Sequence, residues 1–407
     1  MIIEISIENY LSIKEKIVLS LDSSASKKLQ QNIIEFSDKN RLLKSAVIYG
    51  ANASGKSNII RSIFFLWKMV KNSHKFNIDT KIPRSYYKLD ESYSKKPSKF
   101  EIIFIHNKIK YKYGFSCDNE KIIKEYLYYW PHGRESLIFD RTKNNEFKFT
   151  EDRSQQELIK KQMTDNVLYL SRSTQLGYEK TKNAYEFIAN NIVINYSPSW
   201  GEKTIDLIYK NPKLKQKVIE ILQKADFGGI EDLKIEKKKG RMSTITFDNK
   251  GVSRNEEETE IYEIKFEHKN KDGKIVYFNI NEESAGTQKT LSMLGPFFEI
   301  LETGRTAFID ELESSLHPAI TQFLVKLFNS KKNKNNAQLI FTTHDTTLLD
   351  NELFRRDQIY ICSKEPNKQT KLTSFLDFNL REDSDFERAY LNGRVGGVPF
   401  IDETIFD

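Results

Sequence analysis

Alternation of apolar and polar residues marks the strands that the sequence predicts in its first third. Residues 2–20 alternate on both sides of Asn9–Lys14, which predicts two strands joined by a turn. Residues 98–140 alternate again, and polar turns at His106–Lys108 and Asp118–Lys121 divide them as in antiparallel hairpins. We therefore expect an antiparallel β-lobe in this part of the chain.

The middle of the chain changes from helical to strand patterning. Residues 155–225 carry mostly the apolar spacing of helices, which predicts a helical insertion. Between 228 and 280 the alternation of strands returns, and the charged stretches Lys237–Arg241 and Glu256–Glu260 predict turns between short strands. An inserted segment with both helices and strands is expected here.

A short apolar run, Ala46–Tyr49, precedes a loop that contains two glycines. The run predicts a buried strand. After Ser57 the apolar residues recur at the spacing of one helix face, namely at Ile59, Ile63, Leu66, Trp67 and Val70. The sequence thus predicts a strand, a loop and a helix in direct succession.

That loop matches a phosphate-binding motif. Residues 50–59 read G-A-N-A-S-G-K-S-N-I, which fits the pattern G-x-x-x-x-G-K-[ST]. Gly50 and Gly55 allow a close backbone approach, so that consecutive N–H groups can face an anion. Lys56 supplies a positive charge for the β- and γ-phosphates, Ser57 a hydroxyl for Mg²⁺, and the helix its positive dipole end. The residues expected to bind nucleotide are Gly50, Asn52, Ser54, Gly55, Lys56, Ser57 and Asn58, with Asn52 and Ser54 contributing backbone groups at most.

An acidic pair follows a second apolar strand. Thr306–Ile309 predicts this strand, and Asp310 and Glu311 come directly after it. Because adjacent strand residues point in opposite directions, Asp310 can face Mg²⁺ while Glu311 faces the water that attacks the γ-phosphate. Such a pair is also common as a solvated turn, but the phosphate loop upstream favours chemistry. Glu311 is therefore the predicted general base.

The next predicted strand begins at Ala337 and ends at His344. A histidine at this place can hydrogen-bond the γ-phosphate or the attacking water. The alternative is a buried or capping histidine. We assign His344 to catalysis together with Glu311.

Composition excludes several classes of protein. Lys and Arg total 64 and Asp and Glu 57, and the resulting charge of +7 permits a nucleic-acid partner without demanding one. The two cysteines, Cys117 and Cys362, lie far apart, which argues against a disulfide framework or a zinc site. The N-terminus has no signal-peptide pattern, and no apolar run approaches the ~20 residues that span a bilayer. We expect a cytoplasmic protein without a membrane partner.

The order of these motifs resembles the ABC-ATPase superfamily, in which a signature lies between the phosphate loop and the acidic pair. Here S-A-G-T-Q occupies Ser284–Gln288. Within the superfamily the chain resembles the RecF/SMC-like branch, especially the bacterial AAA-family ATPases linked to abortive infection and phage defence. The segments that carry this resemblance are E-N-Y-L-S-I (Glu8–Ile13), the phosphate loop, D-E-L-E-S-S-L-H-P (Asp310–Pro318) and A-Y-L-N-G-R-V-G-G-V-P-F (Ala389–Phe400).

The resemblance implies further site residues. In the superfamily the signature serine and glycine reach across a dimer to the γ-phosphate of the other subunit's ATP, and Ser284 and Gly286 occupy these places. The motif differs from the L-S-G-G-Q of transporters at Ala285 and Thr287, and a helix cap is the alternative interpretation. A glutamine that helps to hold Mg²⁺ is also expected, and Gln175 is the best candidate. Ser57, Asp310 and Gln175 are thus the predicted metal ligands.

The implied fold class is α/β: an ABC-ATPase head, a P-loop NTPase, with an antiparallel β-lobe and an inserted helical and β lobe. The expected limits are 1–75 for the first part of the head, 76–153 for the β-lobe, 154–280 for the insertion and 281–407 for the rest of the head.

The implied function is an ATP-hydrolysing switch that uses ATP and Mg²⁺. It would act as a homodimer or higher assembly and control a separate effector, a nuclease or toxin encoded nearby, in antiphage defence. The alternative is a RecF/SMC-like DNA-repair ATPase, in which Lys237–Arg241 and Lys331–Lys334 would contact DNA phosphates. Such basic runs are usually solvated turns. A transporter ATPase is disfavoured by the large insertions, and a GTPase by the lack of Asn-Lys-x-Asp after a strand.

Overall fold

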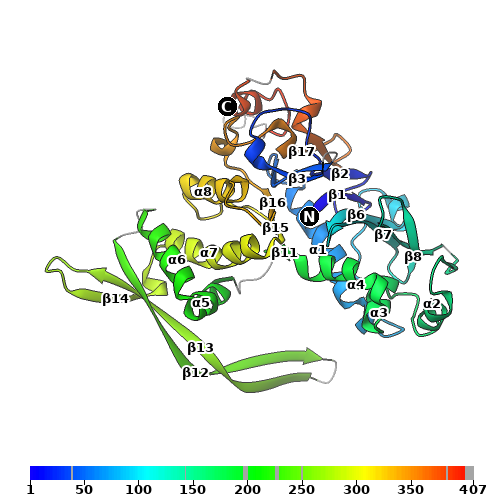
Figure 1. Ribbon diagram of the computed structural model, residues 1–407, viewed down its shortest axis with the longest axis horizontal. Helices are drawn as coiled ribbons and strands as arrows, with labels where there is room; N and C mark the ends of the chain where they lie inside the picture. The colour runs from blue at the N-terminus through cyan, green and yellow to red at the C-terminus, as the bar shows by residue number, and fades with distance from the viewer. Residues whose placement is uncertain are drawn as a thin grey trace, which may run out of the picture. The chain divides into compact units, whose positions relative to one another are not determined.

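The computed structural model describes residues 1–37, 40–142, 144–195, 200–224, 229–248, 251–381 and 384–398, but not the side chains of residues 37, 40, 240–248 and 251–261. The chain divides into two compact units. Unit 1 comprises Met1–Asn195, Ile300–Glu313 and Thr321–Asp407, and unit 2 comprises Tyr196–Glu299 and Ser314–Ile320. Figure 1 labels the helices and strands of both units.

One sheet of unit 1 is antiparallel and has seven strands within the described residues. Their spatial order is β10 (Phe147–Phe149), β9 (Ser136–Arg141), β8 (Ile122–Trp130), β7 (Ile109–Cys117), β6 (Ser98–His106), β1 (Ile2–Glu8) and β2 (Ile17–Ser20). The predicted hairpins are therefore confirmed. The sheet also crosses the predicted limit at residue 75, because Ile5 pairs with Ile102 and Ile7 with Phe100 in the buried core.

The other large sheet of unit 1 is parallel except at one edge. Its described strands are, in order, β11 (Ile192–Ile194), β15 (Thr306–Ile309), β16 (Gln338–Thr342), β5 (Ser45–Tyr49), β17 (Ile359–Lys364) and the antiparallel β18 (Thr370–Ser374). Every residue of β5, β15 and β16 is buried, as expected for parallel strands covered on both faces. A small hairpin of β3 (Ile33–Ser37) and β4 (Asn40–Leu43) forms a separate two-stranded sheet, in which Ile34 and Leu42 pack with Ile105 of β6.

Helix α1 (Lys56–Asn72) follows the phosphate loop, as predicted. Its apolar face belongs to the main core cluster, which also contains residues of both large sheets. The ring centroid of Phe65 lies 5.1 Å from that of Phe100 on β6. The same helix thus packs against the antiparallel sheet and presents its N-terminus at the loop.

The remaining helices of unit 1 are short. They are α2 (Arg153–Lys160), α3 (Tyr169–Gln175), α4 (Glu179–Glu186), α9 (Phe386–Leu391) and, from Thr321 onward, α8 (Pro318–Asn329). Shorter helical turns are η1 (Gln30–Asn32), η2 (Ser73–Lys75), η3 (Glu91–Ser94), η4 (Phe187–Asn191), η6 (Thr346–Leu348), η7 (Arg356–Gln358) and η8 (Phe375–Asp377). None of the described helices is long and apolar enough to cross a membrane.

Unit 2 contains helices packed beside a three-stranded sheet. Its elements are α5 (Trp200–Lys210), α6 (Pro212–Lys224), β12 (Ile230–Asp248), β13 (Gly251–Lys269), β14 (Ile275–Asn279), η5 (Ile280–Glu282) and most of α7 (Ala285–Thr303). Helix α5 packs closely on α7, since a Cβ on Gly295 would lie 2.7 Å from the Cα of Thr204. Of the predicted insertion 154–280, residues up to Asn195 lie in unit 1 and the rest in unit 2.

Between 228 and 280 the last predicted short strand is present as β14, but the other predicted short strands and the charged turns between them are wrong. β12 and β13 form one long hairpin, and the charged stretches expected as turns lie inside its strands (Figure 1). The register explains this, because Lys239 lies opposite Glu260 and Arg241 opposite Glu258. Opposite charges at directly paired positions of neighbouring strands are favourable.

Candidate functional site

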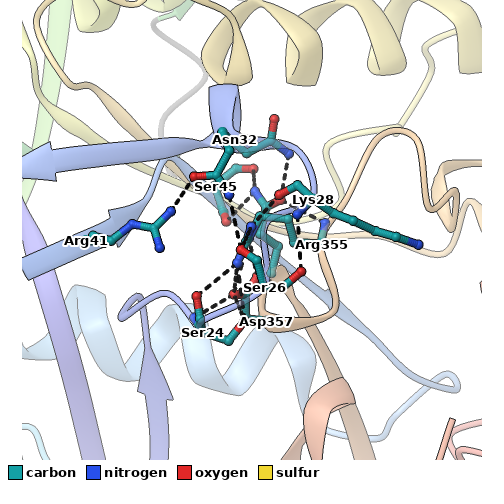
Figure 2. Close-up of polar contacts among 10 residues, drawn as sticks. Ser24, Ser26, Lys28, Asn32, Arg41, Ser45, Arg355 and Asp357 are labelled. Carbon is teal, nitrogen blue, oxygen red and sulfur yellow. Dashed lines mark hydrogen bonds and ion pairs between the residues drawn. The ribbon is translucent and has the colours of Figure 1, made fainter. Parts of the chain in front are cut away.

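The strand that leads into the phosphate loop is anchored at its start by buried polar groups. The side-chain amide of Gln358 donates to the carbonyl oxygen of Ser45 at 3.1 Å and to its hydroxyl at 2.8 Å. Asn32 donates to the Gln358 side-chain oxygen at 2.7 Å. Beside them the Arg355 guanidinium pairs with the Asp357 carboxylate at 2.8 Å, with both side chains nearly inaccessible (Figure 2). β5 is therefore fixed well before the loop begins.

The glycines of the phosphate loop are required by backbone shape and by crowding. Gly50 has φ +153° and Gly55 has φ +113°, in the region that favours glycine. A Cβ on Gly50 would overlap the carbonyl oxygen of Cys362, and one on Gly55 would overlap the hydroxyl of Thr370. Helix α1 starts directly after Gly55, at Lys56. Strand, loop and helix have the predicted arrangement.

Lys56 is buried within the loop. Its ammonium donates to the carbonyl oxygens of Gly50 at 2.8 Å and Ala51 at 3.1 Å. Burial lowers the pKa of Lys56, while the negative charges of Glu311 and Asp310 oppose this shift. The structure thus brings the predicted lysine into electrostatic contact with the predicted acidic pair.

The back of the loop is held by a hydrogen-bonded cluster. The Thr370 hydroxyl donates to the carbonyl oxygen of Ser54 at 2.8 Å and lies 2.7 Å from the Ser12 hydroxyl. The Asn58 side-chain amide donates to Ser12 at 2.7 Å. Asn58, predicted to bind nucleotide, therefore contacts the N-terminal segment. Sequence reasoning missed Thr370, which has no local signal, whereas Ser12 lies inside the E-N-Y-L-S-I segment.

One buried hydroxyl organises the acidic pair. Thr342, the last residue of β16, donates to the Asp310 carboxylate at 2.6 Å and accepts from the Glu311 backbone N–H at 2.8 Å. Glu311 has φ +50°, a left-handed conformation that costs energy for a residue with a side chain. Its side chain is exposed, whereas Asp310 is half-buried. The two carboxylates thus differ in surroundings, as the sequence predicts.

His344 follows β16, between the strand that carries the phosphate loop and the strand that carries the acidic pair. Its backbone N–H donates to the Glu313 carboxylate at 2.6 Å. Partial burial and the positive charge of Lys56 lower the pKa of the His344 ring. The other Glu313 oxygen is buried and has no hydrogen-bond partner among the described residues. The contact between Glu313 and the His344 backbone is a further one that the sequence did not indicate.

The signature residues belong to unit 2, whereas the phosphate loop belongs to unit 1. The Ser284 hydroxyl accepts from the backbone N–H of Thr287 at 3.1 Å at the start of α7. Ser284 is exposed and Gly286 half-buried. Ser284 therefore caps helix α7, and its contact with a second subunit stays a prediction.

Gln175, the predicted third metal ligand, is the last residue of α3. It is exposed, and its side-chain oxygen accepts from the Arg172 guanidinium at 2.7 Å. This contact is local to the helix. A role for Gln175 at the metal stays a prediction.

The donor atoms present fit magnesium better than a transition metal. Among the residues that the structure describes, no three His, Cys, Asp or Glu side chains gather as a metal cluster. The Ser57 hydroxyl and the Asp310 carboxylate are oxygen donors of the kind that Mg²⁺ uses when substrate phosphates complete its shell. These two residues would hold the ion only together with a nucleotide.

A family model described as "AAA domain, putative AbiEii toxin, Type IV TA system" matches residues 45–350. The match runs from β5 to the segment that follows His344 and covers well over half of the chain. The chain belongs to this AAA-domain family. The predicted resemblance to bacterial AAA-family ATPases is thereby confirmed, and the α/β fold with a phosphate loop and a large antiparallel sheet is as expected.

Several solved structures resemble this AAA-domain chain, all at low identity. One is an SMC head bound to the C-terminal winged-helix domain of ScpA, with 16% identity, TM-score 0.46, and coverage of 92% of this chain and 97% of that one. Another is the SMC head domain from Thermotoga maritima, with 13% identity, TM-score 0.41, and coverage of 92% and 98%. A third is an SMC head with an extended coiled coil bound to ScpA from Pyrococcus furiosus, with 13% identity, TM-score 0.42, and coverage of 92% and 96%. A comparison with curated proteins found no match.

Proposed function

We propose that this AAA-domain protein is an ATP-hydrolysing switch that closes as a nucleotide-sandwich dimer and controls a separate effector in bacterial antiphage defence. One observation carries the proposal. The phosphate loop, the acidic pair and His344 follow three neighbouring parallel strands, β5, β15 and β16, at the same edge of the sheet. Ligands of α/β proteins bind at this edge.

The phosphate loop accounts for binding. Gly50 and Gly55 leave the backbone free to approach phosphate oxygens, and Lys56 supplies the charge. Ser57, at the first turn of α1, and Asp310 would hold Mg²⁺, which when bound neutralises charge on the β- and γ-phosphate oxygens. The buried Thr342 hydroxyl orients the Asp310 carboxylate for that task.

Glu311 is the group proposed to accept the proton of the attacking water. Thr342 fixes its backbone N–H, and its side chain is exposed whereas that of Asp310 is half-buried. His344, neutral at pH 7 because its pKa is lowered, would hydrogen-bond the γ-phosphate or the same water. Glu313 fixes the backbone of His344 without using the imidazole.

The second subunit completes the site in this proposal. Ser284 and Gly286 at the start of α7 would face the γ-phosphate bound by the partner subunit, where the helix N-terminus favours negative charge. Hydrolysis would reopen the dimer, and the change would pass through unit 2 to an effector, a nuclease or toxin. The family description, "AAA domain, putative AbiEii toxin, Type IV TA system", supports a defence-related role.

The hairpin of β12 and β13 gives little support to the DNA-repair alternative, in which Lys237–Arg241 would contact DNA phosphates. The stretch Lys237–Arg241 lies along β12, paired with a strand in which Glu258 and Glu260 stand opposite Arg241 and Lys239. Acidic residues at paired positions offset the basic charge that would attract phosphates. Binding of DNA to the wild-type protein at low salt remains the observation that would favour this alternative.

The decisive experiment replaces Glu311 by Gln and measures phosphate release together with ATP-dependent dimerisation. Turnover should fall by about 10²-fold or more, since a general base commonly contributes 10²–10⁴-fold. ATP binding should survive, so that closed dimers accumulate. Asp310→Asn should instead raise the Mg²⁺ concentration needed for turnover.

Glu352→Gln is a matched control, because this exposed acid lies in the same unit and directly follows none of the three strands. It should behave as wild type. If Glu311→Gln hydrolyses ATP within a few-fold of wild type, Glu311 is not the base and the proposed chemistry fails.

A further inference from the structure

The C-terminal segment Phe386–Val398 packs against the phosphate loop. The ring of Tyr390, on α9, lies 5.7 Å from the ring of Tyr49, the last residue of β5. The Tyr390 hydroxyl then donates to the carbonyl oxygen of Gly397 at 2.9 Å. This bond folds the segment after α9 back over the end of β5.

Gly397 lies beside the first glycine of the loop. A Cβ at this residue would lie 3.5 Å from the Cα of Gly50 and 2.7 Å from a methyl carbon of Ile361. Gly393 and Gly396 also have positive φ, but a Cβ on either would meet nothing within 4 Å. Gly397 thus has a φ similar to those of Gly393 and Gly396, but only Gly397 packs closely against other residues.

The same segment also contacts the loop that follows His344. The Thr346 hydroxyl donates to the Glu387 carboxylate of α9 at 2.8 Å. The Tyr49 hydroxyl donates to the carbonyl oxygen of Asp345 at 3.0 Å. Thr346 and Asp345 directly follow His344, so α9 and Tyr49 together fix the loop that carries the histidine.

We propose that Phe386–Val398 is a built part of the nucleotide site, with Tyr390 and Gly397 positioning the first glycine of the phosphate loop and Glu387 positioning the His344 loop. The segment lies beyond the residues matched by the family model, which end at 350. The inference rests on the proposed function, because it assigns positioning residues to that ATP site. It also assigns a role to the glycine-rich motif that begins at Ala389, none of whose residues is among the proposed binding or catalytic residues.

The two contacts predict different kinetic effects. Gly50 is the first residue of the phosphate loop, whose N–H groups would face the phosphates of ATP. A substitution that removes the contact between Gly397 and Gly50 should therefore weaken ATP binding. The His344 loop acts in hydrolysis, so loss of the Glu387 bond should lower kcat and leave ATP affinity unchanged. Displacements of about 1 Å remote from the chemistry can cost as much as 10²-fold, and effects of about five- to tenfold are therefore expected for each contact.

The first experiment compares Gly397→Ala with Gly396→Ala by titration with a fluorescent ATP analogue. Both substitutions place a side chain at similar positive φ, +75° and +69°, so the backbone strain is matched. Gly397→Ala should raise the Kd about tenfold relative to Gly396→Ala. Tyr390→Phe, which keeps the ring and removes the hydroxyl, should raise it by a smaller factor. Equal Kd values for both alanine variants would overturn the role of Gly397.

The second experiment compares Glu387→Ala with Glu387→Gln, which keeps a side-chain oxygen as acceptor for Thr346. Glu387→Ala should lower kcat about fivefold with unchanged Kd, and Glu387→Gln should restore most of the rate. A parallel rise in Kd, or no change in kcat, would contradict this half of the proposal. Thermal unfolding of each variant identifies the temperature at which all remain folded for the assays.

Lys56→Ala separates the failure of this inference from failure of the proposed function. If Lys56→Ala binds the analogue as wild type does, the ATP site itself is wrongly placed. If Lys56→Ala loses binding while the Gly397 and Glu387 variants behave as their controls, the C-terminal segment alone loses its proposed role.

Discussion

Thr342 contacts both residues of the acidic pair. Its hydroxyl is buried and bonds both Asp310 and the backbone of Glu311. Groups that orient metal ligands without touching the metal commonly account for 10–100-fold in activity or metal affinity. The residue has no sequence signal of its own, because threonine is common at strand ends and the partners lie on another strand.

We expect Thr342→Val, which keeps the shape and removes the hydroxyl, to lower ATP turnover by about 10–100-fold. The same variant should need more Mg²⁺, since the Asp310 carboxylate loses its orienting donor. Thr342→Ser keeps the hydroxyl and should retain most of the activity. Phosphate release measured over a Mg²⁺ titration tests this, and a Thr342→Val enzyme with wild-type turnover would show that the bridge is dispensable.

The pKa of His344 gives the site a predictable pH dependence. Partial burial, then the Lys56 charge, lower this pKa below its usual value of about 6.5. The neutral ring therefore dominates at pH 7, and protonation on acidification would remove its acceptor nitrogen. We expect turnover to stay level from pH 8 to 7 and to fall through an apparent pKa below about 6.5. His344→Gln should lower the rate and remove this limb of the profile, and an unchanged limb would assign it to another group.

At the scale of elements, a helix, strand or loop can be predicted where the residues that indicate it all lie in one short segment of the sequence. β5, the loop and α1 follow from an apolar run, two glycines and helical spacing, all within residues 46–70. The acidic pair and His344 follow for the same reason. The long hairpin was not predictable, because its charged residues pair with a partner strand that lies about twenty residues away. The contacts of Ser12, Thr370 and Tyr390 likewise join distant parts of the chain.

The anchor at the start of β5 predicts a stability effect. Arg355 and Asp357 are a buried pair with side-chain exposures of 1% and 2%, and the guanidinium also donates to the Ser26 carbonyl oxygen. Removing one partner of such a pair typically costs about 3–5 kcal/mol, because the other charge stays buried. We expect Arg355→Met to lower the free energy of unfolding by about this amount.

The control is Lys99→Met, which breaks the exposed pair between Lys99 and Glu8 in the same unit. Exposed pairs contribute about 0–1 kcal/mol, so this change should be small. Urea unfolding of both variants, followed by tryptophan fluorescence, makes the comparison. Equal stability of the two variants would show that the buried pair contributes no more than the exposed one.

At the scale of the whole molecule, the proposed site divides its residues between two units. The phosphate loop, acidic pair and His344 lie in unit 1, and Ser284 and Gly286 lie in unit 2. In a sandwich dimer, each nucleotide would contact unit 1 of one subunit and unit 2 of the other. Binding to the monomer and closure of the dimer are therefore separable events, and substitutions in the signature should affect only the second.

Ser284 allows this separation to be tested, because its side chain has two assignable tasks. It caps α7 through the Thr287 backbone N–H, and it is exposed as a dimer contact requires. Ser284→Arg should prevent closure by bulk while leaving ATP binding to the monomer intact. Ser284→Asp is sharper, because aspartate is an equally good helix cap but would bring a negative charge to the partner's γ-phosphate.

Ser284→Asp should therefore keep the stability and the ATP affinity of the wild-type monomer and lose ATP-dependent dimerisation. In the Glu311→Gln background, where closed dimers accumulate, light scattering gives the clearest measure of that loss. Ser284→Ala removes the cap without adding charge, and it should lower stability by about 1 kcal/mol and weaken closure less. If Ser284→Asp closes with ATP as readily as Ser284→Ala, then Ser284 only caps α7. The opposite subunit would in that case have to recognise the γ-phosphate through other groups.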